Sequence, residues 1–75
     1  MYRNIKYGVP YVLTEERFGH HPGTVCYRQV GYDYGLSNDD TRHTGIEHVS
    51  MTLKEDGDYP GFTVPVHILH ERIDA

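Results

Sequence analysis

The chain has 75 residues, which allows one domain at most, and its seven basic and eleven acidic residues give a formal net charge of −4. This charge argues against nucleic acid as a partner, because nucleic-acid-binding domains normally carry a basic stripe. One cysteine, no apolar N-terminal run and no stretch near the roughly 20 apolar residues of a membrane span favour a cytoplasmic protein that does not bind membranes.

The first part of the chain predicts two short strands joined by a turn-rich loop. Residues 1–8 are expected to be a lead-in segment, and residues 9–13 a strand in which Pro10 suits an edge position. Residues 14–17 fit either the end of that strand or one helical turn with Thr14 as N-cap. Pro22 and Gly23 mark a turn. Residues 24–30 predict the second strand, but apolar residues fall on both of its faces, so the buried face stays open.

Residues 31–45 show no clear periodicity and predict a long loop. Unstructured connections of this length in a small domain are usually functional or disordered. The segment contains Tyr32, Tyr34 and Leu36, whereas disordered segments are poor in aromatic residues. We therefore expect an ordered functional loop that packs partly on itself.

Residues 46–66 predict a β-hairpin, because apolar and polar residues alternate in both arms. The apolar positions are Val49, Met51 and Leu53 in the first arm and Phe62, Val64 and Val66 in the second.

Two registers of this hairpin can be compared. A two-residue turn at Asp56 and Gly57 would set Glu55 opposite Asp58, where like charges repel, and would put Pro60 at a hydrogen-bonded ladder position. We therefore expect a longer loop over residues 54–61. The expected pairs are then Leu53–Phe62, Met51–Val64 and Val49–Val66.

Residues 65–73 predict one turn of 3₁₀-helix and a last brief strand. The resulting order of elements resembles an SH3-like barrel, with residues 61–71 similar to its fourth strand, 3₁₀ turn and final strand, and residues 22–25 similar to the start of its second strand. The expected fold is all-β: a single domain over residues 1–75, forming a small five-stranded SH3-like barrel with one 3₁₀ turn before the last strand. A chain this short buries only about 60% of its unfolded surface, so a homo-oligomer fits it as well as a monomer.

The sequence of residues 30–36 and 38–42 resembles that of short uncharacterised proteins of tailed bacteriophages. This resemblance implies a viral, non-enzymatic binding protein in the host cytosol, one that blocks a host defence protein or sequesters a small molecule. The chain lacks the paired aromatic residues with which signalling SH3 domains bind proline-rich helices.

The sequence predicts no catalytic residue, no metal site and no cofactor. His67 and His70 could approach Cys26, His20 and His21, but no zinc-ligand spacing and no second thiol accompany them. The oxygen-bearing side chains between Asp33 and Asp40 do not follow the order of an EF-hand loop. Cys26 with a histidine could form a nucleophile pair, but a strand cysteine is more often a buried apolar residue.

The remaining candidate site is the 31–45 loop, which combines aromatic rings, acceptors and a bidentate donor. Tyr and Arg are enriched in interface hot spots, and the same groups would hold a stacked nucleobase and a phosphate. The tyrosines would equally serve to cover the open end of a barrel. The predicted binding residues are Arg28, Tyr32, Asp33, Tyr34, Asp39, Asp40, Arg42 and His43.

Three functions are considered for the chain. The first is an inhibitor that docks on a host protein through the loop. The second is an oligomeric sponge in which Arg28 and the loop bind a nucleotide messenger. The third is a structural or assembly subunit.

Overall fold

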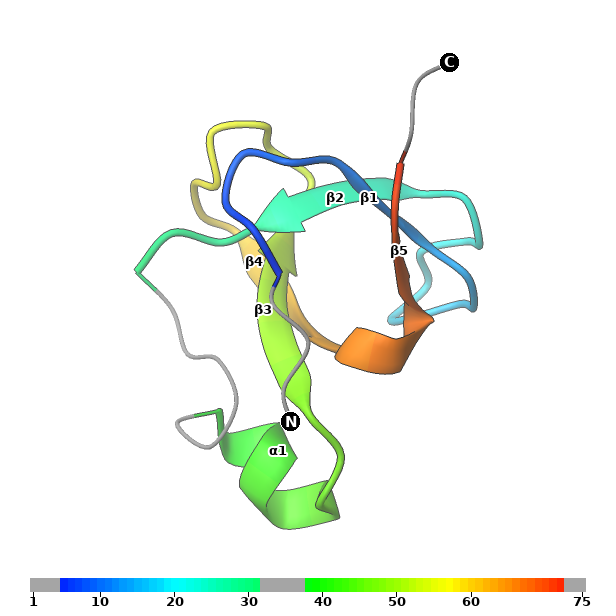
Figure 1. Cartoon of the computed structure of the whole chain (residues 1–75), viewed down its shortest axis with the longest axis vertical. Helices are drawn as coiled ribbons and strands as arrows, with labels where there is room; N and C mark the ends of the chain where they lie inside the picture. The colour runs from blue at the N-terminus through cyan, green and yellow to red at the C-terminus, as the bar shows by residue number, and fades with distance from the viewer. Residues whose placement is uncertain (1–4, 32–37, 73–75) are drawn as a thin grey trace.

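Five strands form one antiparallel sheet, in the order β4-β3-β2-β1-β5, in the computed structural model, which describes residues 5–31 and 38–72 (Figure 1). The predicted strands and the 3₁₀ turn before the last strand are confirmed. In chain order the elements are β1 (Tyr11–Leu13), β2 (Val25–Arg28), helix α1 (Asp39–Thr44), β3 (His48–Thr52), β4 (Gly61–Pro65), the 3₁₀-helix η2 (Val66–Ile68) and β5 (Leu69–Glu71).

The sheet is not closed into the barrel that the sequence predicts. Among the described residues, β4 pairs only with β3, and β5 pairs only with β1, so the two outer strands share no ladder. A closed barrel needs pairing around its whole circumference. Here η2 turns the chain from β4 into a β5 of only three residues, and Pro65 ends β4 without an N–H. The sheet still curls, with β3 and β4 on one side and β5 on the other (Figure 1).

The β3–β4 hairpin differs from its expected register by two residues. The observed partners include Val49–Val64, Met51–Phe62 and Thr52–Gly61. The ladder ends at this last pair, and residues 53–60 leave the sheet as a loop. Glu55 and Asp58 are therefore not cross-strand partners, and Pro60 needs no ladder hydrogen bond. The two arguments against the register of a two-residue turn were repulsion between Glu55 and Asp58 and the missing N–H of Pro60. Neither applies once the loop leaves the sheet.

Loop 53–60 folds back onto β2 through Gly57. The Gly57 carbonyl accepts a 2.9 Å hydrogen bond from the N–H of Val30. Gly57 has φ of +80°, and a Cβ there would lie 2.9 Å from the Arg28 carbonyl oxygen and 2.7 Å from Cγ2 of Val30. Only glycine therefore satisfies both the backbone conformation and the close approach of the two chains.

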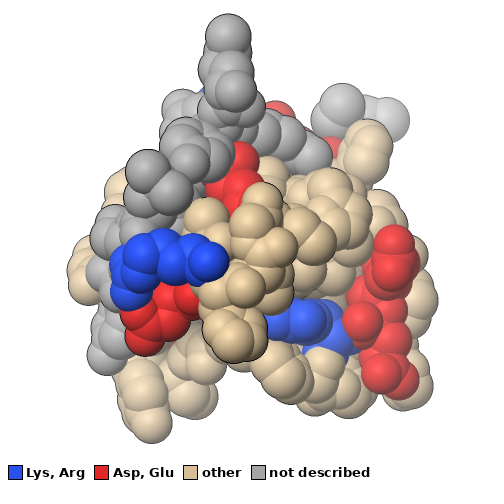
Figure 2. Space-filling model, turned by 90° about the horizontal axis from the view of Figure 1, so that it is seen from below, with Lys and Arg blue, Asp and Glu red and all other residues tan. Residues whose placement is uncertain are grey.

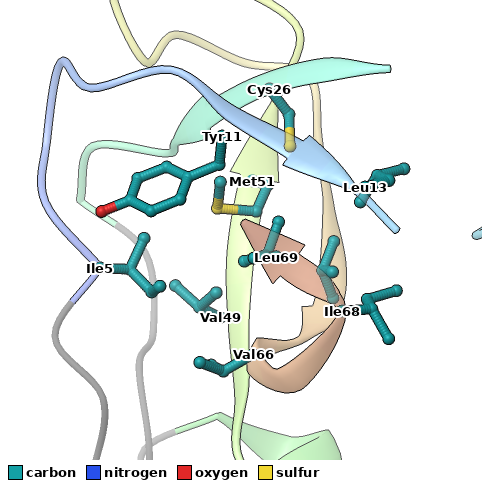
Figure 3. Close-up of a cluster of buried hydrophobic side chains, with 10 residues drawn as sticks. Ile5, Tyr11, Leu13, Cys26, Val49, Met51, Val66, Ile68 and Leu69 are labelled. Atoms are coloured by element: carbon teal, nitrogen blue, oxygen red, sulfur yellow. The ribbon is translucent and has the colours of Figure 1, made fainter. Parts of the chain in front are cut away.

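The core lies inside the curl of the sheet, where side chains from the strands and η2 converge (Figure 3). Cys26 is fully buried, which answers the open question about the second strand, and Ile5 anchors the predicted lead-in segment. Leu53, expected to face inward, is 51% exposed because it begins the loop. The buried apolar residues are Ile5, Tyr11, Leu13, Cys26, Val49, Met51, Val64, Val66, Ile68 and Leu69.

Helix α1 lies in the segment that the sequence predicts to be irregular. Asn38 caps it by accepting a backbone N–H of the first turn, and Gly45, with φ of +77°, ends it by donating to the Thr41 carbonyl. The buried Thr41 hydroxyl accepts the N–H of His48 at 2.8 Å, which fixes the helix to the start of β3. No helix within residues 5–31 and 38–72 has the length and apolar character needed to cross a membrane.

Residues 14–23 form a loop around a tight turn, and neither a longer first strand nor a helical turn is present at residues 14–17. Arg17 and His20 exchange both backbone hydrogen bonds, at 3.0 and 2.9 Å, around Phe18 and Gly19. Both corner residues have positive φ, as in the tightest hairpin turns. The Arg17 Nε donates a 2.9 Å hydrogen bond to the Thr63 carbonyl, which holds this turn against the outer edge of β4.

Candidate functional site

The site predicted on the 31–45 loop lies partly outside the described residues, since Tyr32, Asp33 and Tyr34 fall there. The structure places the other loop residues of the prediction on α1, namely Asp39, Asp40, Arg42 and His43.

Most of the charged side chains of α1 are exposed. Arg42 forms an ion pair with Asp39 one turn earlier, and both side chains are largely exposed. Such surface pairs typically contribute about 0–1 kcal/mol to stability. His43 is exposed and Asp40 is half-buried at the capped end of the helix. The short helix therefore presents a small polar surface.

Arg28, the remaining predicted residue, lies on β2 and contacts the N-terminal segment. Its Nη1 donates to the carbonyl of Ile5 at 2.9 Å, and its guanidinium lies 4.2 Å from the ring centroid of Tyr7. Along the long axis of the molecule, α1 lies at one end and β2 toward the other (Figure 1). The structure therefore separates Arg28 from the predicted residues of α1 and gives it a structural contact.

Cys26 has the environment of a core residue. It is fully buried, and this burial raises the pKa of its thiol to about 12, so the thiol is protonated at neutral pH. Reactive cysteines are partly exposed and have a lowered pKa, so Cys26 has the environment of a buried core thiol. In the described part of the chain, no three His, Cys, Asp or Glu side chains converge where they could hold a metal ion.

A concave apolar site lies between loop 53–60 and the Arg17–His20 turn, and we call it the β4 groove. Its volume is about 360 Å³, within the 300–1,000 Å³ range that is usual for ligand sites. It is lined by His20, Thr52, Leu53, Lys54, Pro60, Gly61 and Phe62.

The walls of the β4 groove present apolar side chains to solvent. The rings of His20 and Phe62 stack with centroids 4.5 Å apart, so the turn and β4 form one continuous wall. Leu53 stands on the loop side and is half exposed. Phe18 in the same turn and Tyr59 in the loop do not line the groove but are 65% and 69% exposed. Exposed apolar residues that gather in one place mark interaction sites more often than isolated ones do.

The charge beside the groove is mainly negative. Loop 53–60 carries Glu55, Asp56 and Asp58 against one cation, Lys54, and all four are exposed. The two aspartates also shape the loop, since their carboxylates accept the N–H groups of Asp58 and Tyr59 at 2.9 and 2.8 Å. On the face seen in Figure 2, basic and acidic side chains lie together in small groups, without a continuous basic surface.

The β4 groove is absent from the sequence-based prediction. That prediction pairs Leu53 with Phe62 inside the sheet, whereas the observed register leaves Leu53 in the loop. Pro60 is the sequence signal that could have indicated the groove. A proline beside a strand marks an edge or a break in strand pairing. His20 reaches the groove only through the turn that Arg17 holds against β4. The chain matches no protein-family model, no curated protein and no solved structure.

Proposed function

We propose that this chain is a non-enzymatic protein-binding domain whose binding surface is the β4 groove. The observation that carries this proposal is the grouping of exposed Leu53 and Pro60 with partly buried Phe62 around one concave site. When a partner side chain enters such a site, apolar groups lose contact with water. This burial is favourable by a free energy of about 25 cal/mol per Å² of apolar area.

We also propose that the fold is an SH3-like barrel that is left open between its outer strands. The strand order β4-β3-β2-β1-β5 and the position of η2 before β5 support it. The resemblance to short phage proteins makes a host protein the first partner to test, with the domain acting as an inhibitor that covers part of that protein's surface.

The test begins with capture of a partner from a bacterial lysate and continues with the captured protein purified separately. Calorimetry then compares wild type with Leu53→Glu, which places a charge in the groove at a half-exposed position. We expect at least a 30-fold loss of affinity, since hot-spot changes cost about 2 kcal/mol or more.

Two variants serve as controls. Ile46→Glu makes the same change at a residue that is 47% exposed and precedes the opposite end of β3, and it should bind like wild type. Arg42→Ala tests α1 and the predicted loop site. Loss of binding in Arg42→Ala with full binding in Leu53→Glu would move the interface to α1 and contradict the groove proposal.

A further inference from the structure

The backbone N–H and C=O of Gly61, a residue that lines the β4 groove, point away from β3. In an antiparallel ladder, hydrogen-bonded and non-hydrogen-bonded pairs alternate along the strands. The N–H of Val66 donates to the Glu47 carbonyl at 2.9 Å, so this pair is hydrogen-bonded. Because hydrogen-bonded residues recur at every second position, Val64 and Phe62 also bond to β3. The N–H and C=O groups of the residues between them point away from β3.

Two contacts on either side of the hairpin confirm this alternation. The Thr63 carbonyl accepts the Arg17 Nε from the outer side of β4. Its partner Ser50 accepts the N–H of Gln29 from β2, so the Ser50 carbonyl faces away from β4. Gly61 lies two residues from Thr63, so its backbone N–H and C=O point to the same outer side of β4 as the Thr63 carbonyl.

Most of this outer edge is closed. Arg17 occupies the Thr63 carbonyl, and Pro65 has no N–H to offer. Among the described residues none hydrogen-bonds to the N–H or C=O of Gly61 from this side, and Gly61 lines the groove. The β4 groove thus combines apolar walls with one main-chain donor and acceptor, whereas the blocked positions limit pairing to a single residue pair.

We propose that the occupant of the β4 groove is a short extended segment of a partner protein. One residue of that segment exchanges two main-chain hydrogen bonds with Gly61, in the manner of strand addition. Side chains alternate along a strand, so the neighbouring residue projects on the side of Phe62 and meets Leu53 and Pro60. This inference rests on the proposed function and specifies the form of its partner.

The charge of loop 53–60 specifies the residues beside this anchor. Loop 53–60, which forms one wall of the groove, carries three exposed carboxylates, from Glu55, Asp56 and Asp58, and one ammonium group, that of Lys54, which lines the groove. Opposite charges across an interface favour the encounter and orient the partner. The segment therefore carries a Lys or Arg next to its apolar residue.

The test uses a display library of random decapeptides, selected on wild type and counter-selected on Leu53→Glu. We expect enrichment of an apolar residue beside Lys or Arg, with Ile46→Glu selecting the same peptides. The best peptide is then synthesised with each backbone amide N-methylated in turn. Methylation at the residue adjacent to the apolar anchor should lower affinity at least tenfold, and the unmodified peptide should shift the NMR amide signal of Gly61.

Each other outcome overturns a defined part of this inference. No enrichment over Leu53→Glu contradicts the peptide as occupant. Enriched peptides that tolerate every methylation, and leave the Gly61 amide unshifted, contradict strand pairing but leave the protein-binding function intact. A wild type that self-associates through the groove, while Leu53→Glu stays monomeric by sedimentation, identifies a second copy as the occupant in place of a peptide.

Discussion

At the scale of single residues, the hydroxyl of Thr52 holds loop 53–60 from inside the protein. Thr52 is fully buried, and its Oγ1 lies 2.8 Å from the carbonyl oxygens of both Asp58 and Pro60 while accepting the N–H of Lys54 at 3.2 Å. A hydroxyl has one proton, which these two carbonyls must share. One side chain therefore organises the loop that forms a wall of the groove.

Thr52→Val keeps the shape of this side chain and removes its donor and acceptor. We expect the free energy of unfolding to fall by about 1–3 kcal/mol, because three backbone groups lose their partner. Urea denaturation measures the change. Thr24→Val is the matched control, since its hydroxyl donates to the His21 carbonyl in an exposed turn, where water can replace it. Equal losses in the two variants would contradict the role given to Thr52.

The buried thiol of Cys26 predicts a loss of stability at high pH. Its pKa rises from an ordinary 9.0 to about 12 on folding, so between these values the unfolded chain releases a proton that the folded chain keeps. The unfolded state then binds fewer protons, and the free energy of unfolding falls by about 1.4 kcal/mol per pH unit above pH 9. Below pH 9 the thiol contributes no pH dependence.

This prediction is measured by urea denaturation at pH 8 and pH 10.5. Wild type should lose about 2 kcal/mol more than Cys26→Ala over this interval, since other titrating groups are common to both. Parallel losses in the two proteins would show that the thiol does not titrate as its burial requires.

At the scale of elements, loop 53–60 depends on a glycine for two separate reasons. Gly57 and Gly45 have nearly the same positive φ, +80° and +77°, but an added Cβ meets nothing within 4 Å at Gly45 and strikes β2 at Gly57. Gly45→Ala should therefore cost only the conformational term, about 1–2 kcal/mol. Gly57→Ala should cost about 1–3 kcal/mol more, because the backbone of loop or strand must shift.

Thermal or urea unfolding of both alanine variants separates the two terms. The same experiment reports on the groove, because a loop displaced from β2 also displaces Leu53 and Pro60. If both variants were equally stable, the close approach of Gly57 to β2 would not exist in solution.

At the scale of the whole molecule, Arg17 joins two segments that are far apart in sequence. Its bond to the Thr63 carbonyl closes the outer edge of β4 and sets the position of the turn that carries His20. Edge strands with free backbone groups pair with other chains unless they are covered or charged. Arg17 is therefore expected to keep copies of this domain apart.

Arg17→Ala should raise the average mass of the protein in sedimentation velocity at high concentration, relative to wild type. Arg42→Ala is the control, because it also removes one positive charge, but from an exposed side chain that pairs with Asp39 on α1. An unchanged mass distribution in Arg17→Ala would mean that other features of the edge suffice to prevent pairing.

The local pattern of the sequence was sufficient for the strands and the 3₁₀ turn, whereas the structure decided that Cys26 is buried. Period-2 alternation and turn residues are properties of neighbouring positions, so they can be read without knowing the fold. Helix α1 also had its signals, with Asn38 before it and Gly45 after it. Six residues are too few to show helical periodicity, so its existence escaped prediction.

The hairpin register and the β4 groove were decided by tertiary contacts. The register depends on where loop 53–60 leaves the ladder, and that depends on the bond from Val30 to Gly57 across the sheet. The groove depends on Arg17 reaching Thr63, which brings His20 against Phe62. Sequence alone therefore determined which segments become strands, whereas the contacts between distant segments decided how the strands align and which apolar side chains remain exposed.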